Sequence, residues 1–411
     1  MKKPIPLLFL FWILILFPPS SWSQLILGQY EDEAPFRTWN TFSFATAPSL
    51  GLGESHFSLA SDCSVALSNP ALLVFLPRTT FTLNTSFNSA SFFKYSMINT
   101  GVLSSEKNIY LSLYALDFGG ISLRLKSWAF ALSQALLETY DRPQAKYDYF
   151  YQGNLYYSLN FTQKGVLKNL NFSLSRKFSR RIAIGLGLNF VYGDLKKEIT
   201  EEWISDDITI RDSLSQKFKG LFLNGGFLVE LSDTLSVAAV FRTPYIKKSD
   251  SQSLLRYSSP RGGTDIKIEA SSKDKYKQPL VIGIGAGYKV SPQLRFGADL
   301  SFFNWSRYKV DYFEETQERN FKDTLKIGAG MEYSTDFQLF EQKFDLPFRV
   351  GLSYDRQPMK EPISSYLYYS LGIGLHWKGI FLDLGAFLGS ERGSGNSLSA
   401  KKVALSLTFQ L

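Results

Sequence analysis

The chain has 411 residues, 45% of them hydrophobic and 16% aromatic, and a formal net charge of +8. Its one cysteine, Cys63, excludes an internal disulfide, and with only two histidines it has no Cys/His cluster at metal-ligand spacing. The excess of Lys and Arg fits contacts with anionic lipid phosphates better than a nucleic-acid surface, because no nucleic-acid motif is present.

The N-terminus has the form of a secretory signal. Two lysines precede the apolar run Ile5–Phe17, and Ser21–Ser23 supplies small residues at the positions that a signal peptidase reads. We expect residues 1–23 to be a signal peptide that is cleaved before Gln24. The apolar run is too short for a retained anchor, because a spanning helix needs about 20 residues.

Residues 24–78 differ from the rest of the chain. They hold short apolar pieces, the glycines Gly51 and Gly53, and the stretch Ser68–Leu72 with an Asn-Pro-Ala core. Proline and glycine of this kind favour compact turns and short helices over spanning strands. The sequence therefore predicts a small N-terminal domain ahead of the strands.

From residue 79 to the end, apolar and polar residues alternate with a period of two in about fourteen segments. In the last segment one face holds Val403, Leu405, Leu407, Phe409 and Leu411. Short and long connections alternate, as in outer-membrane barrels, and only 335–345 is longer than a periplasmic turn should be. These features predict an all-β fold: a transmembrane antiparallel β-barrel over residues 79–411.

Aromatic residues near the strand ends on the long-loop side are typical of an aromatic girdle at the membrane surface. The candidates are Tyr192, Tyr245, Trp305, Tyr308 and Tyr354. Basic residues surround one long loop, where they form a solvated surface or contact lipopolysaccharide phosphates. They are Lys247, Lys248, Arg256, Arg261, Lys267, Lys273, Lys275 and Lys277.

Several charged residues fall on the face opposite the apolar stripe and should point into the lumen, because a charge that faces lipid is costly. They are Arg242, Asp299, Lys326, Glu332, Arg349, Asp355 and Asp383. Two interpretations remain open. The charges form an internal ion-pair network, or Lys326 or Arg349 receives the carboxylate of a passing amphiphile.

The search for an active site is mostly negative. By parity His376 points into the lumen, but nothing in the sequence supports a Ser–His pair for lipid hydrolysis. Gly283–Gly287 mimics a phosphate loop, yet its glycines share one strand face, as small residues inside a filled barrel would. We expect no enzyme activity, no cofactor and no metal.

Six short segments, spread over nearly all of the mature chain, resemble the FadL/OmpP1/TodX family of outer-membrane transporters. Three of them match the family's N-terminal hatch, and three match its strand ends in the second half. The segments are Ser49–Gly53, Ala60–Ser64, Ser68–Leu72, Phe303–Tyr308, Phe321–Thr324 and Leu346–Asp355. One departure is the C-terminal residue, Leu411, where the family has an aromatic residue.

The resemblance implies a fourteen-stranded barrel whose lumen is plugged by the hatch, residues 24–78. It implies passive uptake of long-chain fatty acids or other hydrophobic compounds, with release sideways into the membrane at a kinked third strand. That strand is Trp128–Tyr140 here, and we place the kink at Ser133 and Gln134. The hatch positions that match are Gly51, Gly53, Asp62, Asn69, Pro70 and Ala71.

The expected ligand is a fatty acid or hydrocarbon, and Phe57, Leu59 and Phe75 are candidates to line its pocket, although core packing of the hatch also explains them. We expect the chain in the bacterial outer membrane, in contact with its lipid and lipopolysaccharide, after insertion by the barrel-assembly machinery. An alternative is a PorV-type barrel, which shares the hatch signature and serves as a docking platform in protein secretion.

Overall fold

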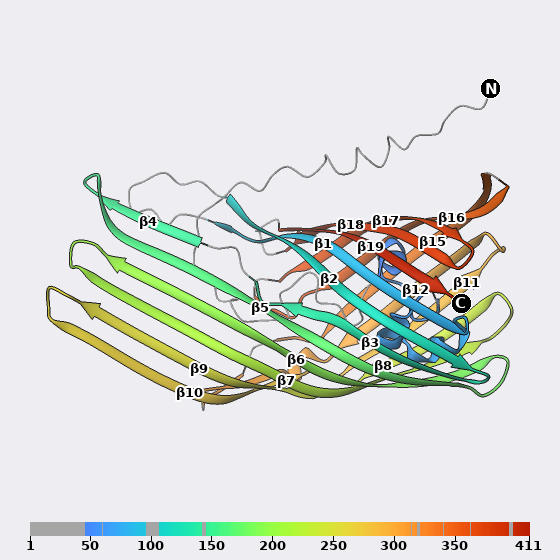
Figure 1. Ribbon diagram of the computed structural model, residues 1–411, viewed down its shortest axis with the longest axis horizontal. Coiled ribbons are helices and arrows are strands. Elements are labelled where there is room, and N and C mark those ends of the chain that lie inside the picture. Colours follow the sequence, from blue (N-terminus) through green and yellow to red (C-terminus); the bar gives the residue numbers. More distant parts are fainter. Residues whose placement is uncertain are drawn as a thin grey trace, which may run out of the picture.

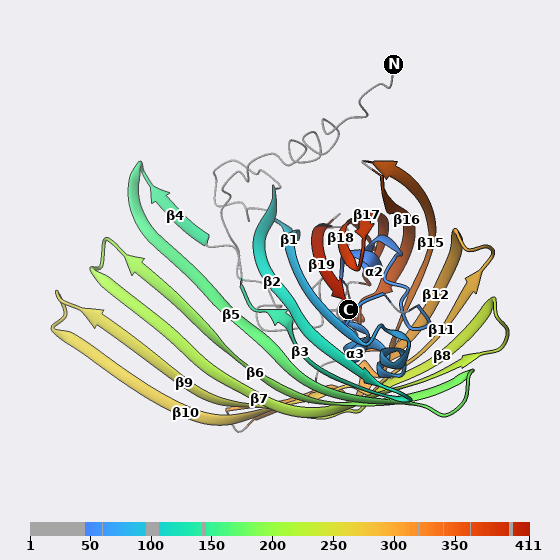
Figure 2. The same ribbon diagram turned by 45° about the vertical axis from the view of Figure 1, so that its right-hand side comes forward.

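The computed structural model describes residues 46–59, 61–95, 107–141, 145–313, 315–318, 321–339, 341–361, 363–393 and 398–411. The predicted signal peptide and the first part of the predicted hatch lie outside these residues. Within them the chain forms one continuous antiparallel sheet that closes on itself, with short helices inside (Figure 1, Figure 2).

In the described residues fourteen strands build the barrel wall, which confirms the predicted fold class. These strands are β1 (Thr79–Tyr95), β2 (Lys107–Leu125), β3 (Trp128–Thr139), β5 (Asn154–Lys177), β6 (Ile182–Trp203), β7 (Ile208–Glu230), β8 (Leu235–Arg242), β11 (Val281–Lys289), β12 (Leu294–Phe303), β15 (Thr324–Leu339), β16 (Gln342–Arg356), β17 (Ser365–Trp377), β18 (Ile380–Arg392) and β19 (Ser399–Gln410).

The last strand closes the barrel against the first. Phe409 of β19 is the register partner of Phe81 on β1, and Leu407 is the partner of Leu83. The barrel thus has no free sheet edge at its ends, and each backbone group in this part of the wall has a partner inside the protein. That closure is what allows strands to lie in lipid.

An apolar belt surrounds the wall because every second side chain points outward. Ile184, Leu223, Ile284, Leu371 and Leu405 are among the large apolar side chains that this face exposes. In water such a surface would be unstable, whereas lipid tails solvate it. A closed barrel with this belt confirms the predicted location in the bacterial outer membrane. Among the described residues no helix is long and apolar enough to cross a bilayer.

Five further strands extend the wall or fold against it. They are β4 (Ala145–Tyr151), β9 (Tyr245–Ser259), β10 (Thr264–Gln278), β13 (Lys309–Tyr312) and β14 (Glu315–Glu318). Along β5 the hydrogen-bonded partner changes from β3 to β4, and along β7 it changes from β8 to β9. The strands β4, β5, β6, β7, β9 and β10 thus form a curved sheet that projects beyond the barrel, which we call the projecting sheet (Figure 1, Figure 2).

Most strands of the projecting sheet are longer than is needed to cross a bilayer. β6 has 22 residues, which corresponds to roughly 70 Å of extended chain, whereas crossing the bilayer takes about 9–11 residues. β11 has only 9 residues. The extra length lies on the long-loop side, which in outer-membrane barrels faces outside the cell.

The connection at 335–345, which the sequence indicated to be too long for a periplasmic turn, belongs largely to two long strands. β15 runs to Leu339 and β16 begins at Gln342, and pairs such as Phe337 with Phe344 continue the ladder past the belt. The connection is therefore a tight turn at the tip of an extended hairpin. Aromatic rings stack on this hairpin: the ring centroid of Phe344 lies 5.2 Å from that of Phe337 and 6.0 Å from that of Trp377.

Residues 46–78 lie inside the barrel near its short-turn end, and we call them the hatch (Figure 2). α2 (Ala47–Gly51) contacts β16, β17, β18 and β19. α3 (Val65–Ser68) and η2 (Pro70–Phe75) contact the opposite wall, chiefly β5, β6 and β7. A third short helix, η3 (Trp305–Arg307), follows β12.

The belt yields a prediction for stability in a bilayer. Ile284 on β11 and Ile268 on β10 are similarly exposed, at 56% and 54%, but only Ile284 lies in the belt. We expect Ile284→Arg to destabilise the barrel by about 2–4 kcal/mol, because the charge meets lipid. Ile268→Arg should change stability by less than about 0.5 kcal/mol, as surface substitutions usually do. Urea titration of both variants in liposomes measures this, and equal effects would contradict the proposed belt.

Candidate functional site

The hatch rests on glycines that line the inner face of the wall. A Cβ on Gly185 would overlap the backbone of Pro70 and Ala71, and a Cβ on Gly226 would overlap the side chain of Asn69. On the opposite wall Gly330, Gly351, Gly372 and Gly385 face α2 and the turn after it in the same way. Because these positions lack side chains, the backbone of the hatch can approach the backbone of the strands directly.

Gly53 shows why the predicted glycine-rich start is needed. Its φ is +65°, and a Cβ there would lie 2.6 Å from the carbonyl oxygens of Ala329 and Leu352. Both the left-handed conformation and the close approach to β15 and β16 require glycine. Gly51 faces Gly372 at the end of α2. Both residues therefore seat the hatch.

The Asn-Pro-Ala stretch begins η2. The Asn69 side chain accepts a hydrogen bond from Ala71 N at 3.1 Å and donates one to the carbonyl oxygen of Phe57 at 2.6 Å. Asn69 thus caps the helix and ties it to the preceding turn. Pro70 occupies the first helical position, where its missing N–H costs nothing.

Asp62 organises the turn before α3. Its carboxylate accepts hydrogen bonds from Thr46 Oγ1 at 2.6 Å and from Ser64 N at 2.8 Å. Next to it, Cys63 is fully buried, and its thiol donates to the carbonyl oxygen of Thr80 at 3.1 Å. Burial raises the pKa of the Cys63 thiol to about 12, which keeps the thiol protonated and unreactive.

The hatch is also tied to the wall by charge. Asp299 on β12 accepts hydrogen bonds from the backbone N–H of His56 at 2.6 Å and of Phe57 at 2.9 Å. Lys326 on β15 forms an ion pair with Glu54 of the hatch. Burial lowers the pKa of the His56 imidazole to about 4, so this side chain is neutral at physiological pH.

Lys326 and Arg349 thus already have carboxylate partners within the protein. Arg349 lies 2.7 Å from Glu332 and 2.7 Å from Asp383, and His376 lies 3.1 Å from Asp383. These distances support the ion-pair network among the two interpretations of the inward charges. We place both cations in that network, which fixes the hatch and stiffens the wall.

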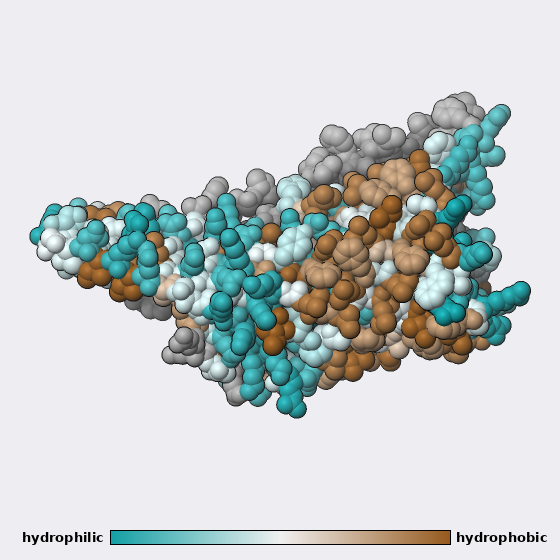
Figure 3. Space-filling model, turned by 60° about the horizontal axis from the view of Figure 1, so that its bottom comes forward, coloured by the Kyte–Doolittle hydropathy of each residue, from teal (hydrophilic) through white to brown (hydrophobic). Residues whose placement is uncertain are grey.

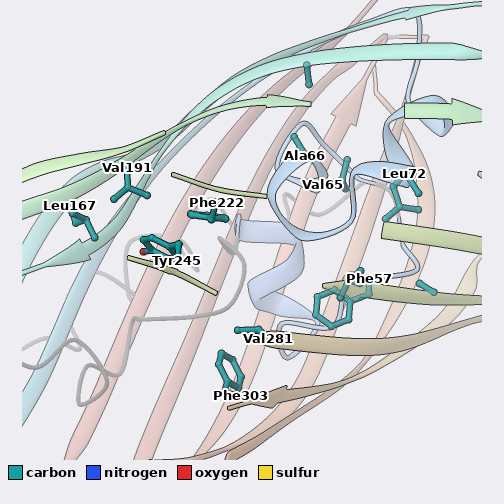
Figure 4. Close-up of a cluster of buried hydrophobic side chains, with 14 of the residues drawn as sticks. Phe57, Val65, Ala66, Leu72, Leu167, Val191, Phe222, Tyr245, Val281 and Phe303 are labelled. Carbon is teal, nitrogen blue, oxygen red and sulfur yellow. The ribbon is translucent and has the colours of Figure 1, made fainter. Parts of the chain in front are cut away.

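The proposed pocket residues of the hatch lie in three different surroundings. Phe57 packs on Gly283 and Gly285 of β11, which accounts for the glycine run that mimics a phosphate loop. Leu59 packs on the neighbouring glycines Gly287 and Gly297. Phe75 lies 4.4 Å below the ammonium group of Lys177, toward the short-turn end. Phe57 belongs to the same buried apolar cluster as Phe222 and Phe303 (Figure 4), and Phe75 packs against that cluster.

Beyond the hatch, on the long-loop side, aromatic rings fill the lumen. Each is at most 9% exposed, and neighbouring ring centroids lie 4.9 to 6.4 Å apart. Figure 4 shows Phe222, Tyr245 and Phe303 of this group. We call the group the lumenal aromatic cluster; it consists of Tyr140, Phe218, Phe222, Tyr245, Tyr276, Phe303, Trp305, Tyr308 and Phe321.

A buried lysine lies within this cluster. The Lys247 ammonium group donates to the Tyr140 hydroxyl at 2.7 Å and lies 3.7 Å from Glu138. It also lies 5.0 Å from the ring centres of Phe218 and Tyr276. Cation–π contacts of this kind stabilise a desolvated ammonium group. Lys247 and Glu138 therefore form a buried ion pair among the aromatic rings.

The sequence prediction for Lys247, Tyr245, Trp305 and Tyr308 was wrong. All four were expected on the surface, but they are buried in the lumen. Between β8 and β9 the strand is interrupted at Thr243 and Pro244, and the side-chain alternation reverses there, so Tyr245 and Lys247 turn inward. Proline cannot donate to a ladder, and this was the signal available in the sequence. Tyr192 and Tyr354 do face outward, being 42% and 41% exposed.

Two neighbouring strands of the wall part next to the cluster. β2 pairs with β3 only from Phe118 to Leu125, and its residues beyond Phe118 pair with β1 alone. On the other side β3 and then β4 pair with β5. The described strands therefore lose their contact with each other where Tyr140 and Glu138 line the lumen.

The irregularity of the third strand does not coincide with the predicted kink at Ser133 and Gln134. Ser133 and Gln134 pair regularly with both neighbours, β2 and β5. The register shift lies between Leu136 and Glu138, where β3 carries one extra residue against β5. The extra residue turns Glu138 inward, to within 3.7 Å of Lys247. A second irregularity lies in β2 at Asp117, where the register with β1 steps from Phe118 to Leu116.

Nothing in the described part of the chain gathers three or more His, Cys, Asp or Glu side chains around a possible metal position. In the described residues the site consists of an aromatic lumen with the buried Lys247–Glu138 ion pair, a seated hatch at one end, and the place at one side where β2 and β3 part.

A family model, BamG, matches residues 55–397. No curated protein matches the chain. Among solved structures, a Pseudomonas aeruginosa FadL homologue aligns with a TM-score of 0.65 at 14% identity, over 90% of this chain and 99% of that one. The Pseudomonas putida toluene transporter TodX aligns at 0.63 and 11% identity, over 90% and 99% of the two chains.

The Ralstonia pickettii toluene transporter TbuX aligns with a TM-score of 0.60 at 11% identity, over 90% of this chain and 99% of that one. At these identities the likeness is one of fold. It confirms the FadL-type barrel that the sequence motifs predicted.

The seating of the hatch can be tested through Cys63. We expect the thiol to resist maleimide in the folded barrel, because it is buried. Gly226→Ala should displace Asn69 and raise the alkylation rate roughly 5- to 100-fold, since overpacking costs about 1–3 kcal/mol. Gly119→Ala is the matched control, because its Cβ would make only ordinary contact with Leu83. If both variants react at the same rate as the original protein, the glycine seat is not what holds the hatch.

Proposed function

The chain belongs to the BamG family, and from its aromatic lumen beside an unpaired strand edge we propose that it takes up hydrophobic compounds into the outer membrane. The single observation that carries the proposal is that the aromatic lumen lies next to the unpaired edge of β2. Apolar solutes partition onto aromatic walls, and an opening at the outer edge of the belt offers them lipid in place of water.

The hatch supports this route. It fills the short-turn end of the lumen and is held there by glycine contacts and by the ion pair between Glu54 and Lys326. A solute that enters from the long-loop side then meets a closed periplasmic end. The gap between β2 and β3 is the alternative exit, and it requires no movement of the hatch.

The ligand class follows from the lumenal aromatic cluster. Its rings suit an aromatic hydrocarbon or an acyl chain. The solved relatives include two toluene transporters and a monoaromatic hydrocarbon channel. We propose a monoaromatic hydrocarbon or a fatty acid as the substrate.

Removing the extra residue of β3 tests lateral release. Deleting Leu137 should restore regular pairing between β3 and β5 while leaving the inward direction of Glu138 unchanged. We expect ligand binding in detergent to stay within about twofold, whereas uptake by a host that lacks its own transporter falls about tenfold or more, as for a closed gate. Leu137→Ala, which keeps the extra residue, should transport normally. Undiminished uptake by the deletion variant would exclude this exit.

A second candidate function is a docking platform for an exported protein, and the inner face of the projecting sheet favours it. Leu255, Ile266 and Ile268 point to that face and are 36 to 54% exposed. Trp203 packs on Tyr157 nearby, with ring centres 4.7 Å apart. Apolar patches on a projecting surface are typical of protein interfaces.

Ile268→Arg tests this second candidate, because it adds a charge to the projecting face without entering the belt. Under the docking hypothesis a partner that co-purifies with the original protein from its native host is lost from the variant, while ligand uptake is unchanged. Under the uptake hypothesis alone, the set of co-purifying proteins is the same for both.

A further inference from the structure

Lysines form a continuous row across the outer face of the projecting sheet. In register, Lys168 of β5 pairs with Tyr192 of β6, Tyr192 with Lys219 of β7, Lys219 with Lys248 of β9, and Lys248 with Lys275 of β10. Adjacent strands lie about 4.8 Å apart, so a rigid backbone holds these residues at fixed spacing. We call this set the lysine row.

The next outward-facing row lies two residues further from the belt along each strand and adds charge of both signs. It consists of Val166, Asp194, Lys217, Asp250 and Lys273. Together the two rows carry six lysines and two aspartates, a net charge of +4. Asp250 lies 3.1 Å from Lys219, and both side chains are more than half exposed. The ion pair therefore leaves most of the positive charge available to a partner.

The lysine row lies directly at the edge of the apolar belt. On the membrane side the next outward residues are Leu170, Phe190 and Leu221, which are register partners of one another. Figure 3 shows this face, with a hydrophilic band beside the hydrophobic belt. The band lies on the side of the long loops and of the projecting sheet. It is therefore at the height of the head groups of the outer leaflet.

A ligand that fits both parts has closely spaced anionic groups joined to acyl chains. Phosphate groups on the sugar backbone of lipid A meet this description, because they lie at the boundary between the acyl chains and the saccharide. We propose that the lysine row binds the phosphates of one lipopolysaccharide molecule, whose acyl chains lie along Leu170, Phe190 and Leu221. Tyr192, between Lys168 and Lys219 in the row, places its ring at the same boundary.

This site is separate from the lumenal site. Lys247 points into the lumenal aromatic cluster, and the next residue, Lys248, points outward in the lysine row. Substitutions in the row therefore leave the lumen unchanged, and the failure of either proposal says nothing about the other.

The test uses the full-length barrel in detergent and three probes: bisphosphorylated lipid A, its dephosphorylated form and phosphatidylglycerol. The variant replaces Lys219, Lys248 and Lys275 by Gln. The matched control replaces Lys126, Lys289 and Lys343, exposed lysines at the short-turn end, by Gln. Native mass spectrometry or a fluorescent competition assay measures binding.

We expect the original protein to prefer bisphosphorylated lipid A to both other probes. The row variant should bind it about 100-fold more weakly, since each lysine near an anionic surface contributes roughly a fivefold factor. The control variant should stay within about twofold. Equal binding by the row variant, or equal affinity for phosphatidylglycerol, would overturn the proposal. Unchanged ligand binding in the lumen verifies that the variant is folded.

Discussion

In a bilayer each backbone N–H and C=O group must find its partner within the protein, and the closed ladder from β1 to β19 meets this requirement. The ladder imposes strict alternation on the side chains. One face then meets lipid, and the other meets the hatch. Most of the organisation of this protein follows from that alternation, including the belt, the inward glycines and the lysine row.

Where the alternation is interrupted, the molecule acquires its distinctive interior. At Thr243 and Pro244 the reversal turns Tyr245 and Lys247 into the lumen. At Leu136 to Glu138 the extra residue brings a carboxylate to the same place. The buried ammonium group of Lys247 and its carboxylate partner Glu138 are thus products of two irregularities on different strands.

The family and the fold carry different information. The family model that matches is BamG, whereas the fold is shared with FadL-type transporters at 11 to 14% identity. Function depends on the site and not on the fold. The aromatic lumen and the unpaired edge of β2 support uptake, and the apolar inner face of the projecting sheet supports a docking role that is compatible with it. The lysine row on the outer face of the same sheet is a third surface, and its proposed partner is lipopolysaccharide.

The sequence by itself determined the barrel class, the outer-membrane location and the hatch motifs, because a period of two and short local motifs are read from neighbours along the chain. It also predicted that the side chains of Arg349 and Asp383 point into the lumen and not toward lipid. Only the tertiary structure decided which carboxylate each cation meets, that Lys247 is buried, and where β2 and β3 part. Those outcomes depend on register between strands far apart in the chain, and one inserted residue or one proline reverses the face of everything that follows.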